Sequence, residues 1–182
     1  MSYKTENQIF TDIKAVLDAF LATLTSQSGW KVLRGNQPVP VGINNKMILI
    51  SKVYATRYGW QGSTDKDIAD NYKHVEMWWE ELRWQLSFFC QRDPKNDTTA
   101  TWTAEDMAKR VMAYLDGMAG LQALLKKGYR KLRNAMITPG SFVNDSELYE
   151  FNPSFDIVLL HQQTVESAAQ WATIGDMQAV GI

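Results

Sequence analysis

Few side chains in this sequence have the type and spacing that chemistry requires. The two histidines, His74 and His161, lie far apart, and neither has a second ligand at the spacing a bound metal needs. Two pairs of adjacent carboxylates, Glu80 with Glu81 and Glu105 with Asp106, could act as acid and base or help to hold a metal. However, neighbours on a strand point to opposite faces, and acidic residues suit the first turn of a helix. We therefore expect a protein without catalytic residues, cofactor or metal, that is, not an enzyme.

Basic and aromatic residues could instead contact nucleic acid. Five basic residues between Lys126 and Arg133 form the one basic cluster, which fits either a phosphate-binding patch or a solvated helix end. Trp78 and Trp79 could stack on bases. The chain has 19 Lys and Arg against 20 Asp and Glu, a net charge of −1. Because phosphate contacts demand an excess of basic residues, this balance argues against a dedicated nucleic-acid binder.

Aromatic residues point to an interface with other proteins. The chain has seven Trp among 182 residues, more than one core usually hides, and Trp is enriched at interfaces. The polar segment 57–71 places aromatic residues beside charged ones, as interface anchors with a polar rim require. We expect it to contact another subunit or partner through six residues: Arg57, Tyr58, Trp60, Asp65, Lys66 and Asp67.

The length fits a single domain, residues 1–182, with its core at about 5–160 and a C-terminal extension at 161–182. Thr5 and Gln8 form a capping box before apolar residues at helical spacing, which predicts a helix from there to residues 25–29. Strands are predicted at 47–54 and 75–90, with a helix as the alternative for 76–86. The apolar residues of the second strand change parity at Glu80 and Glu81, which predicts a β-bulge there. Residues 57–71 are either a long exposed loop or the tip of an extended hairpin.

The second half of the chain is predicted to hold one capped helix and two strands. Thr103 caps a helix whose apolar face includes Met107, Val111, Leu115 and Met118. The remaining elements are a loop at 93–101, a helical turn at 121–127 closed by Gly128, a strand at 131–137, a loop at 139–146 and a strand at 155–161. This order predicts an α+β fold with a mainly antiparallel sheet, flanked by the long N-terminal helix and a second central helix.

Several of these segments together resemble one family. They are the opening helix and the segments 30–40, 47–54, 79–88, 105–107, 131–133 and 151–156. In this order they resemble the tail-terminator or neck (head-tail joining) proteins of tailed bacteriophages. The resemblance implies a tail-terminator-like fold and a virion structural protein, assembled in the host cytoplasm as a homo-oligomer, a hexameric ring. Such a ring would terminate the tail tube and join it to the head connector.

The resemblance also implies partners. These would be further copies of the chain and the neighbouring neck, connector, tail-tube or sheath proteins, with DNA passing through the channel without specific binding and no contact with a membrane. Two alternatives stay open on the residues alone. One is a small non-enzymatic host-directed or scaffold binding protein, which measurement of the oligomer size would separate from a ring. The other is an enzyme that uses a carboxylate pair and a metal, whose activity Glu81→Gln would abolish.

Overall fold

The computed structural model describes residues 3–24, 29–35, 46–68, 71–90, 102–143 and 149–168. Helices and strands alternate irregularly along the chain. In order they are α1 (Glu6–Ala22), β1 (Lys31–Arg34), β2 (Lys46–Ile68), β3 (Asn71–Cys90), α2 (Ala104–Asp116), α3 (Met118–Lys126), β4 (Tyr129–Asn134), β5 (Ser141–Val143), β6 (Tyr149–Phe151) and β7 (Ser154–Ala168). No helix of the described residues is long and apolar enough to cross a membrane.

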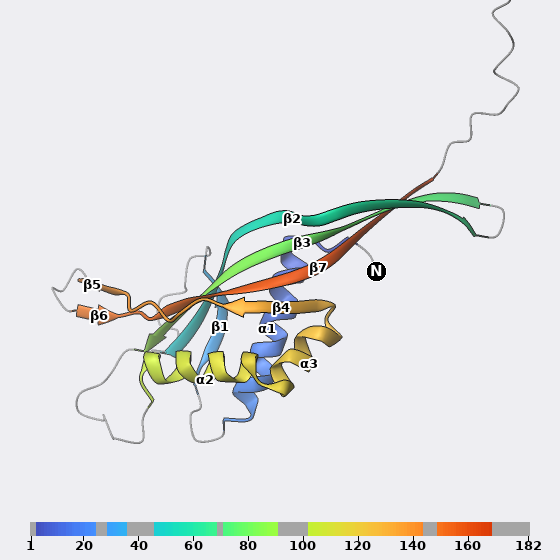
Figure 1. The fold of residues 1–182 in the computed structure, drawn as a ribbon. Coiled ribbons are helices and arrows are strands. Elements are labelled where there is room, and N and C mark those ends of the chain that lie inside the picture. Colours follow the sequence, from blue (N-terminus) through green and yellow to red (C-terminus); the bar gives the residue numbers. More distant parts are fainter. Residues whose placement is uncertain are drawn as a thin grey trace, which may run out of the picture.

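The main sheet has five strands in the order β1-β2-β3-β7-β4 (Figure 1). Among the described strands only β1 and β2 pair in parallel, and the other pairs of this sheet are antiparallel. β5 and β6 form a separate two-stranded ribbon. The sequence prediction of an α+β fold with a mainly antiparallel sheet is therefore confirmed.

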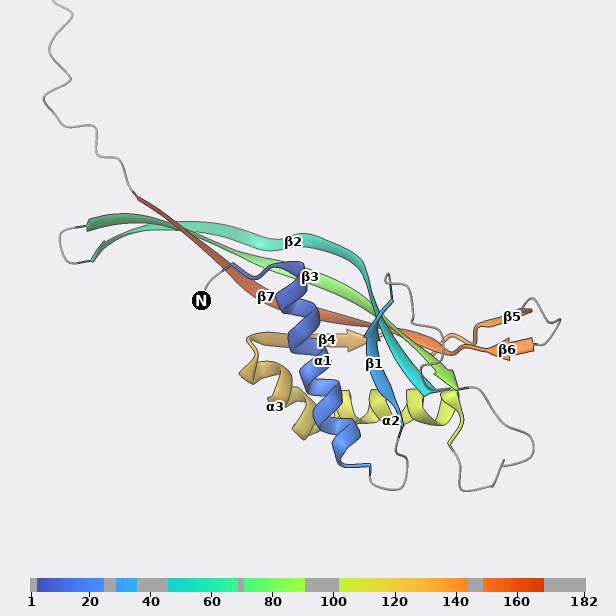
Figure 2. The same cartoon turned by 180° about the vertical axis from the view of Figure 1, so that it is seen from behind.

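The three helices named above pack against one face of this sheet, and α1 runs across it in Figure 2. Ile13 and Leu17 of α1 are buried in one core cluster with strand residues, among them Leu82 and Trp84 of β3 and Ile157 of β7. Each such side chain stabilises the fold by about 1.5–3 kcal/mol when it is fully buried. This single layer of helices fixes the base from which the longer strands extend.

Local capping signals set where the helices begin. Thr5 and Gln8 form a capping box at the start of α1, as predicted, and Thr103 and Asp106 form one at the start of α2. Gly117 interrupts the predicted face, so that Met118 begins α3 and is 70% exposed instead of joining the core. The turn closed by Gly128 is confirmed, and this residue has a φ of +86°, which favours glycine.

In the long hairpin of β2 and β3 the structure differs from the sequence prediction at two places. Residues 57–71 are not a loop, because β2 and β3 stay paired as far as Ile68 and Asn71; the hairpin tip was the correct alternative. No bulge lies at Glu80 and Glu81, since β3 pairs with β7 without interruption there. The irregularities lie in β2, where the register shifts after Lys52 and again after Tyr58.

The parity change in β3 has another physical cause. Leu82 and Trp84 face the helices, whereas Val75, Met77 and Trp79 have the other parity and face the opposite side of a regular strand. The apolar residues therefore change face because the helices end, not because the backbone contains an extra residue. The helix alternative for residues 76–86 was wrong, because this segment pairs with β7 throughout and with β2 apart from two register shifts.

Several boundaries differ from the sequence prediction. The first helix ends at Ala22, before the predicted 25–29. β4 covers Tyr129–Asn134 instead of 131–137, and β5 lies within the predicted loop at 139–146. β7 continues beyond 161 to Ala168. The predicted loop at 93–101 lies outside the described residues.

Candidate functional site

Three strands project beyond the helices as a narrow arm, visible in Figure 1. We define the arm as residues 57–68 of β2, 71–79 of β3 and 162–168 of β7. β1 pairs with β2 only as far as Ile50, and β4 pairs with β7 only as far as His161. Beyond these points no further described strand pairs with either outer edge of the sheet. Within the part of the chain that the structure describes, the arm thus has two open edges, one on β2 and one on β7.

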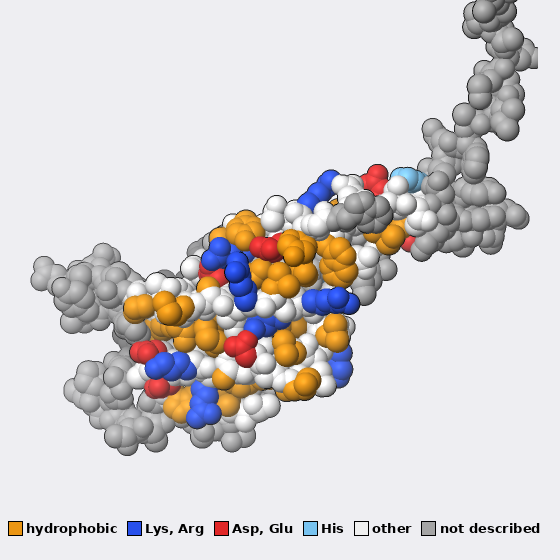
Figure 3. Space-filling model, in the orientation of Figure 1, with side chains coloured by type: hydrophobic (Ala, Val, Ile, Leu, Met, Phe, Trp, Pro, Cys, Tyr) orange, Lys and Arg blue, Asp and Glu red, His pale blue; other side chains and the backbone are white. Residues whose placement is uncertain are grey.

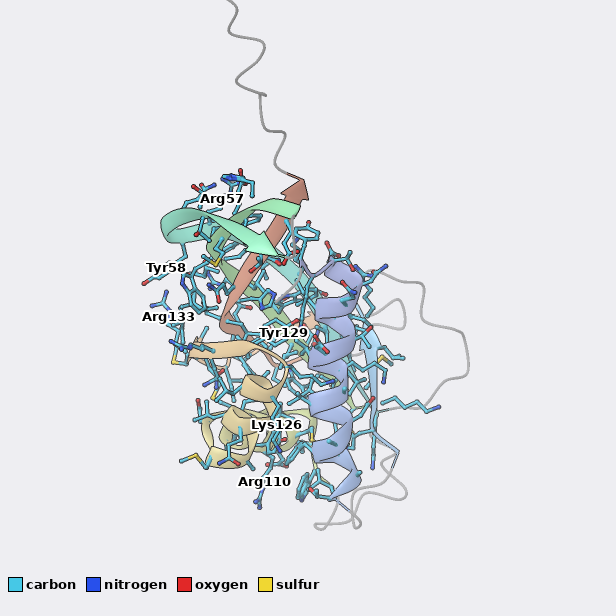
Figure 4. All side chains as sticks on the ribbon, turned by 90° about the vertical axis from the view of Figure 1, so that its right-hand side faces the viewer. Arg57, Tyr58, Arg110, Lys126, Tyr129 and Arg133 are labelled. Carbon is cyan, nitrogen blue, oxygen red and sulfur yellow. The ribbon has the colours of Figure 1, made fainter. Side chains whose placement is uncertain are left out.

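The six residues expected at an interface all lie on the β2 strand of the arm. The guanidinium of Arg57 lies 5.0 Å from the ring centre of Trp78, and Arg57 Nη1 donates a hydrogen bond to Gln61 Oε1 at 3.0 Å. Tyr58 pairs in register with Trp79 and is 49% exposed. Figure 4 shows Arg57 and Tyr58 near the same end of the molecule.

For Trp60, Asp65, Lys66 and Asp67 the structure describes the backbone but not the side chains. Strand pairing brings all six residues onto one edge strand, next to β3 on one side and the open edge on the other. Their role as an interface stays a prediction.

The face of the sheet opposite the helices carries aromatic rings and paired charges. We call this surface the outer face. Tyr54 Oη donates a hydrogen bond to Glu81 Oε1 at 2.7 Å, and Arg83 Nε lies 2.8 Å from Asp156 Oδ2. Figure 3 shows hydrophobic side chains gathered on this side with Lys and Arg among them. Glu81 and Asp156 therefore each accept a hydrogen bond from a neighbouring strand on this face.

The guanidinium of Arg130 completes this surface, 5.4 Å from the ring centre of Trp79. Sequence reasoning missed Tyr54, Arg83 and Arg130. A signal for Arg83 was present, because it alternates with the core residues Leu82 and Trp84 on a predicted strand and so must face away from the core. The sequence carried no comparable signal for Arg130, because its contact with Trp79 depends on β7 lying between β3 and β4.

A partly buried polar cluster links the N-terminal segment to the base of the arm. We call it the polar tie. Lys4 Nζ lies 2.7 Å from Asp12 Oδ2 and donates to the carbonyl of Lys127 at 2.6 Å. Tyr129, which is buried, donates its hydroxyl to the same Asp12 oxygen at 3.0 Å. The backbone N–H of Lys4 donates to Gln163 Oε1 at 3.0 Å, which fixes the segment against β7.

Electrostatics in the polar tie favour fixed protonation states. Burial opposes the charge on Asp12, but hydrogen bonds from Lys4 and Tyr129 outweigh it and hold the pKa of this carboxyl below its ordinary value. Burial, together with Asp12, raises the pKa of Tyr129. Burial lowers the pKa of His161, whose Nδ1 lies 3.0 Å from the carbonyl of Gly128. A neutral His161 that donates to this carbonyl has a structural role in holding the turn at Gly128.

The candidate catalytic pairs do not converge. Glu80 and Glu81 lie on opposite faces of β3, Glu80 accepting from Gln163 Nε2 at 2.7 Å and Glu81 from Tyr54. Glu105 pairs with Lys109 at 2.7 Å and Asp106 caps α2. Within the described ranges no three His, Cys, Asp or Glu side chains gather closely enough to hold a metal ion.

The basic cluster is divided in the fold. Lys131 pairs with Asp116, and Lys127 lies 3.4 Å from Asp12. Arg130 stacks on the outer face instead. These three members therefore serve three different contacts within the chain.

Comparison with protein families decides the broader identity. The family model described as E217 gateway protein gp29 matches residues 8–171, which include most of α1 and every strand. The chain belongs to this gateway protein family. It is therefore a structural protein of a phage virion with a role in the tail or neck, which confirms the resemblance seen in the sequence at this level.

Other comparisons are more distant. A solved structure described as the PVC sheath/tube terminator of an extracellular contractile injection system, in the extended state, is similar with a TM-score of 0.46 and 10% identity. The match covers 100% of this chain and 66% of the terminator chain. The chain therefore spans slightly less than two thirds of the length of that structure. A search of curated proteins finds no match.

Proposed function

We propose that six copies of this chain form a closed ring in the phage neck, which terminates the tail tube and joins it to the head connector. The observation that carries the proposal is membership of the gateway protein family along residues 8–171. The number of copies follows the resemblance to tail terminators. Each copy acts as a single domain, and its neighbours along the particle are tail-tube, sheath and connector proteins.

The physical form of the subunit supports a ring. A closed ring requires a heterologous interface, in which two different patches of each copy match one another. The arm supplies two different open edges, and the outer face supplies a third surface for proteins above or below the ring. We place the subunit contacts at Arg57, Tyr58, Trp60, Asp65, Lys66 and Asp67, on one of these edges.

The charge distribution supports a channel that passes DNA without gripping it. Tight non-specific binding needs cations that are available to neutralise phosphates. In the described structure Lys4, Arg83, Lys127 and Lys131 are all committed to carboxylates of the same chain. The net charge of −1 adds no general attraction for DNA.

Native mass spectrometry of the purified chain, together with immunogold labelling of intact virions, tests this function. We expect a six-copy assembly and label at the junction between head and tail. A stable monomer at high concentration that is also absent from virions would refute the proposal. Label at the junction with a different copy number would correct the ring size alone.

A further inference from the structure

The backbone groups of β7 alternate between its two neighbours. The N–H of Phe88 in β3 donates to the carbonyl of Pro153 at 2.9 Å, and the N–H of Ser154 donates to Thr138 on the other side at 3.0 Å. In an antiparallel ladder this alternation continues residue by residue. Because the register with β3 is unbroken, odd-numbered residues of β7 bond to β3 and even-numbered residues point toward the β4 side. The N–H of Ala135 donates to the carbonyl of Asp156 at 2.7 Å, which confirms that this even-numbered residue points toward the β4 side.

The outward-pointing side of β7 is open along the arm. β4 ends its pairing at His161, so the N–H and C=O groups of Gln162 and Thr164 point away from β3 where β4 no longer runs. Among the described residues no backbone hydrogen bond reaches these groups. Residues 162–165 contain no proline and no lysine, and β7 has no bulge here. Natural edge strands are usually protected by such features, and an edge without them is a template for another strand.

The same reasoning identifies the open side of β2. The carbonyl of Ile50 accepts from the N–H of Gly35 at 2.9 Å, on the side away from β3. Following the register along β2, the backbone groups of Ala55, Arg57 and Ser63 also point away from β3. β1 ends its pairing at Ile50, which leaves these groups at the second open edge.

The two edges match in direction. β2 and β7 are both antiparallel to β3, so both run from the body of the subunit toward the end of the arm. In a ring with rotational symmetry all arms point the same way, and the β7 edge of one copy meets the β2 edge of the next in parallel. We propose that neighbouring copies join by this parallel pairing of β7 with β2, which continues one sheet around the ring. This inference rests on the ring proposed above.

Six copies joined by this strand pairing would form a closed cylinder wide enough for a channel. Three strands from each of six copies give about 18 strands, and at ~4.8 Å spacing and ~40° tilt these close into a cylinder roughly 36 Å across. Barrels of about 16–18 strands leave an open aqueous channel. The arms would therefore line the channel that the proposed function requires.

Two proline substitutions test the pairing without breaking the subunit. Thr164→Pro removes an N–H that points out of the sheet on β7, and Ser63→Pro does the same on β2. Neither removes a bond to β3. We expect each variant to keep the thermal midpoint of the isolated subunit and to form no ring. Val165→Pro is the matched control. The N–H of Val165 bonds to β3, so the loss of this bond should lower the thermal midpoint of the isolated subunit.

A mixture of the two variants gives the sharpest result. The Ser63→Pro subunit keeps an intact β7 edge, and the Thr164→Pro subunit keeps an intact β2 edge. Native mass spectrometry should therefore find a one-to-one heterodimer in the mixture and only monomers in each variant alone. Normal rings of Thr164→Pro or Ser63→Pro would overturn the strand pairing while leaving the ring intact. A wild-type chain that forms no ring would overturn both proposals.

Discussion

Replacement of Tyr129 by Phe should weaken the fold by an amount that depends on pH. The hydroxyl of this buried side chain donates to the carboxylate of Asp12, and a hydrogen bond to a charged group contributes about 1.5–3 kcal/mol. Lys4 and Lys127 continue to pair with Asp12 in the variant. We therefore expect the free energy of unfolding to fall by an amount near the lower end of this range, about 1.5 kcal/mol at pH 7. This change lowers the thermal midpoint by roughly 3–6 °C.

The dependence on pH follows from the sign of the Asp12 shift. Its folded pKa lies below the ordinary value of 3.8, so its stabilisation is fully present above that value and is lost as the pH falls through the folded pKa. The effect of Tyr129→Phe should accordingly shrink toward acid pH. Urea unfolding of the dilute subunit at a series of pH values from 7 down to 3, followed by Trp fluorescence, measures it. Tyr3→Phe, at a side chain that is 56% exposed, is the control. A loss below half a kcal/mol at pH 7, or an equal loss at every pH, would refute this assignment of the hydrogen bond.

Three further predictions concern the core, a helix cap and the arm. Leu17→Ala removes a fully buried side chain and should cost about 2–5 kcal/mol, whereas Phe20→Ala should cost less because Phe20 is only partly buried and stacks on Tyr114; comparative urea unfolding decides between them. Thr103→Ala removes the cap of α2 and should cost about 1 kcal/mol in the same assay, and no measurable loss would show that the cap is dispensable. Hydrogen exchange of the free subunit should be fast at the amide of Thr164 and slow at its neighbour Val165, and assembly should slow Thr164; equal protection in the monomer would contradict the open edge.

Elements set by local signals could be predicted from the sequence. The capping boxes at Thr5 and Thr103 fixed where α1 and α2 begin, because the residues involved lie within one helical turn. Alternating or β-branched residues likewise located the first part of β2 and of β7 and most of β3. Among the tryptophans, Trp30 and Trp84 proved to be core residues, while Trp78 and Trp79 are partly exposed.

The arm could not be derived in the same way. Its β2 segment, residues 57–68, is mostly polar and has no apolar residue between Trp60 and Ile68, so no sustained hydrophobic period distinguishes a strand from a loop. Insertion of β7 between β3 and β4 depends on pairing between distant segments, which no local pattern encodes. The contact of Arg130 with Trp79 on the outer face follows from that insertion, and so it was missed. The interface at Arg57 to Asp67, and the division into a core at 5–160 and an extension at 161–182, stay predictions.

A three-dimensional reconstruction of the head-to-tail junction in intact virions tests the central claim most directly. We predict six copies of the chain in one closed ring between the tail tube and the head connector, with β7 of each copy beside β2 of the next. Density at this junction that contains no copy of the chain would contradict the proposed function. A ring whose arms do not touch would contradict the strand pairing.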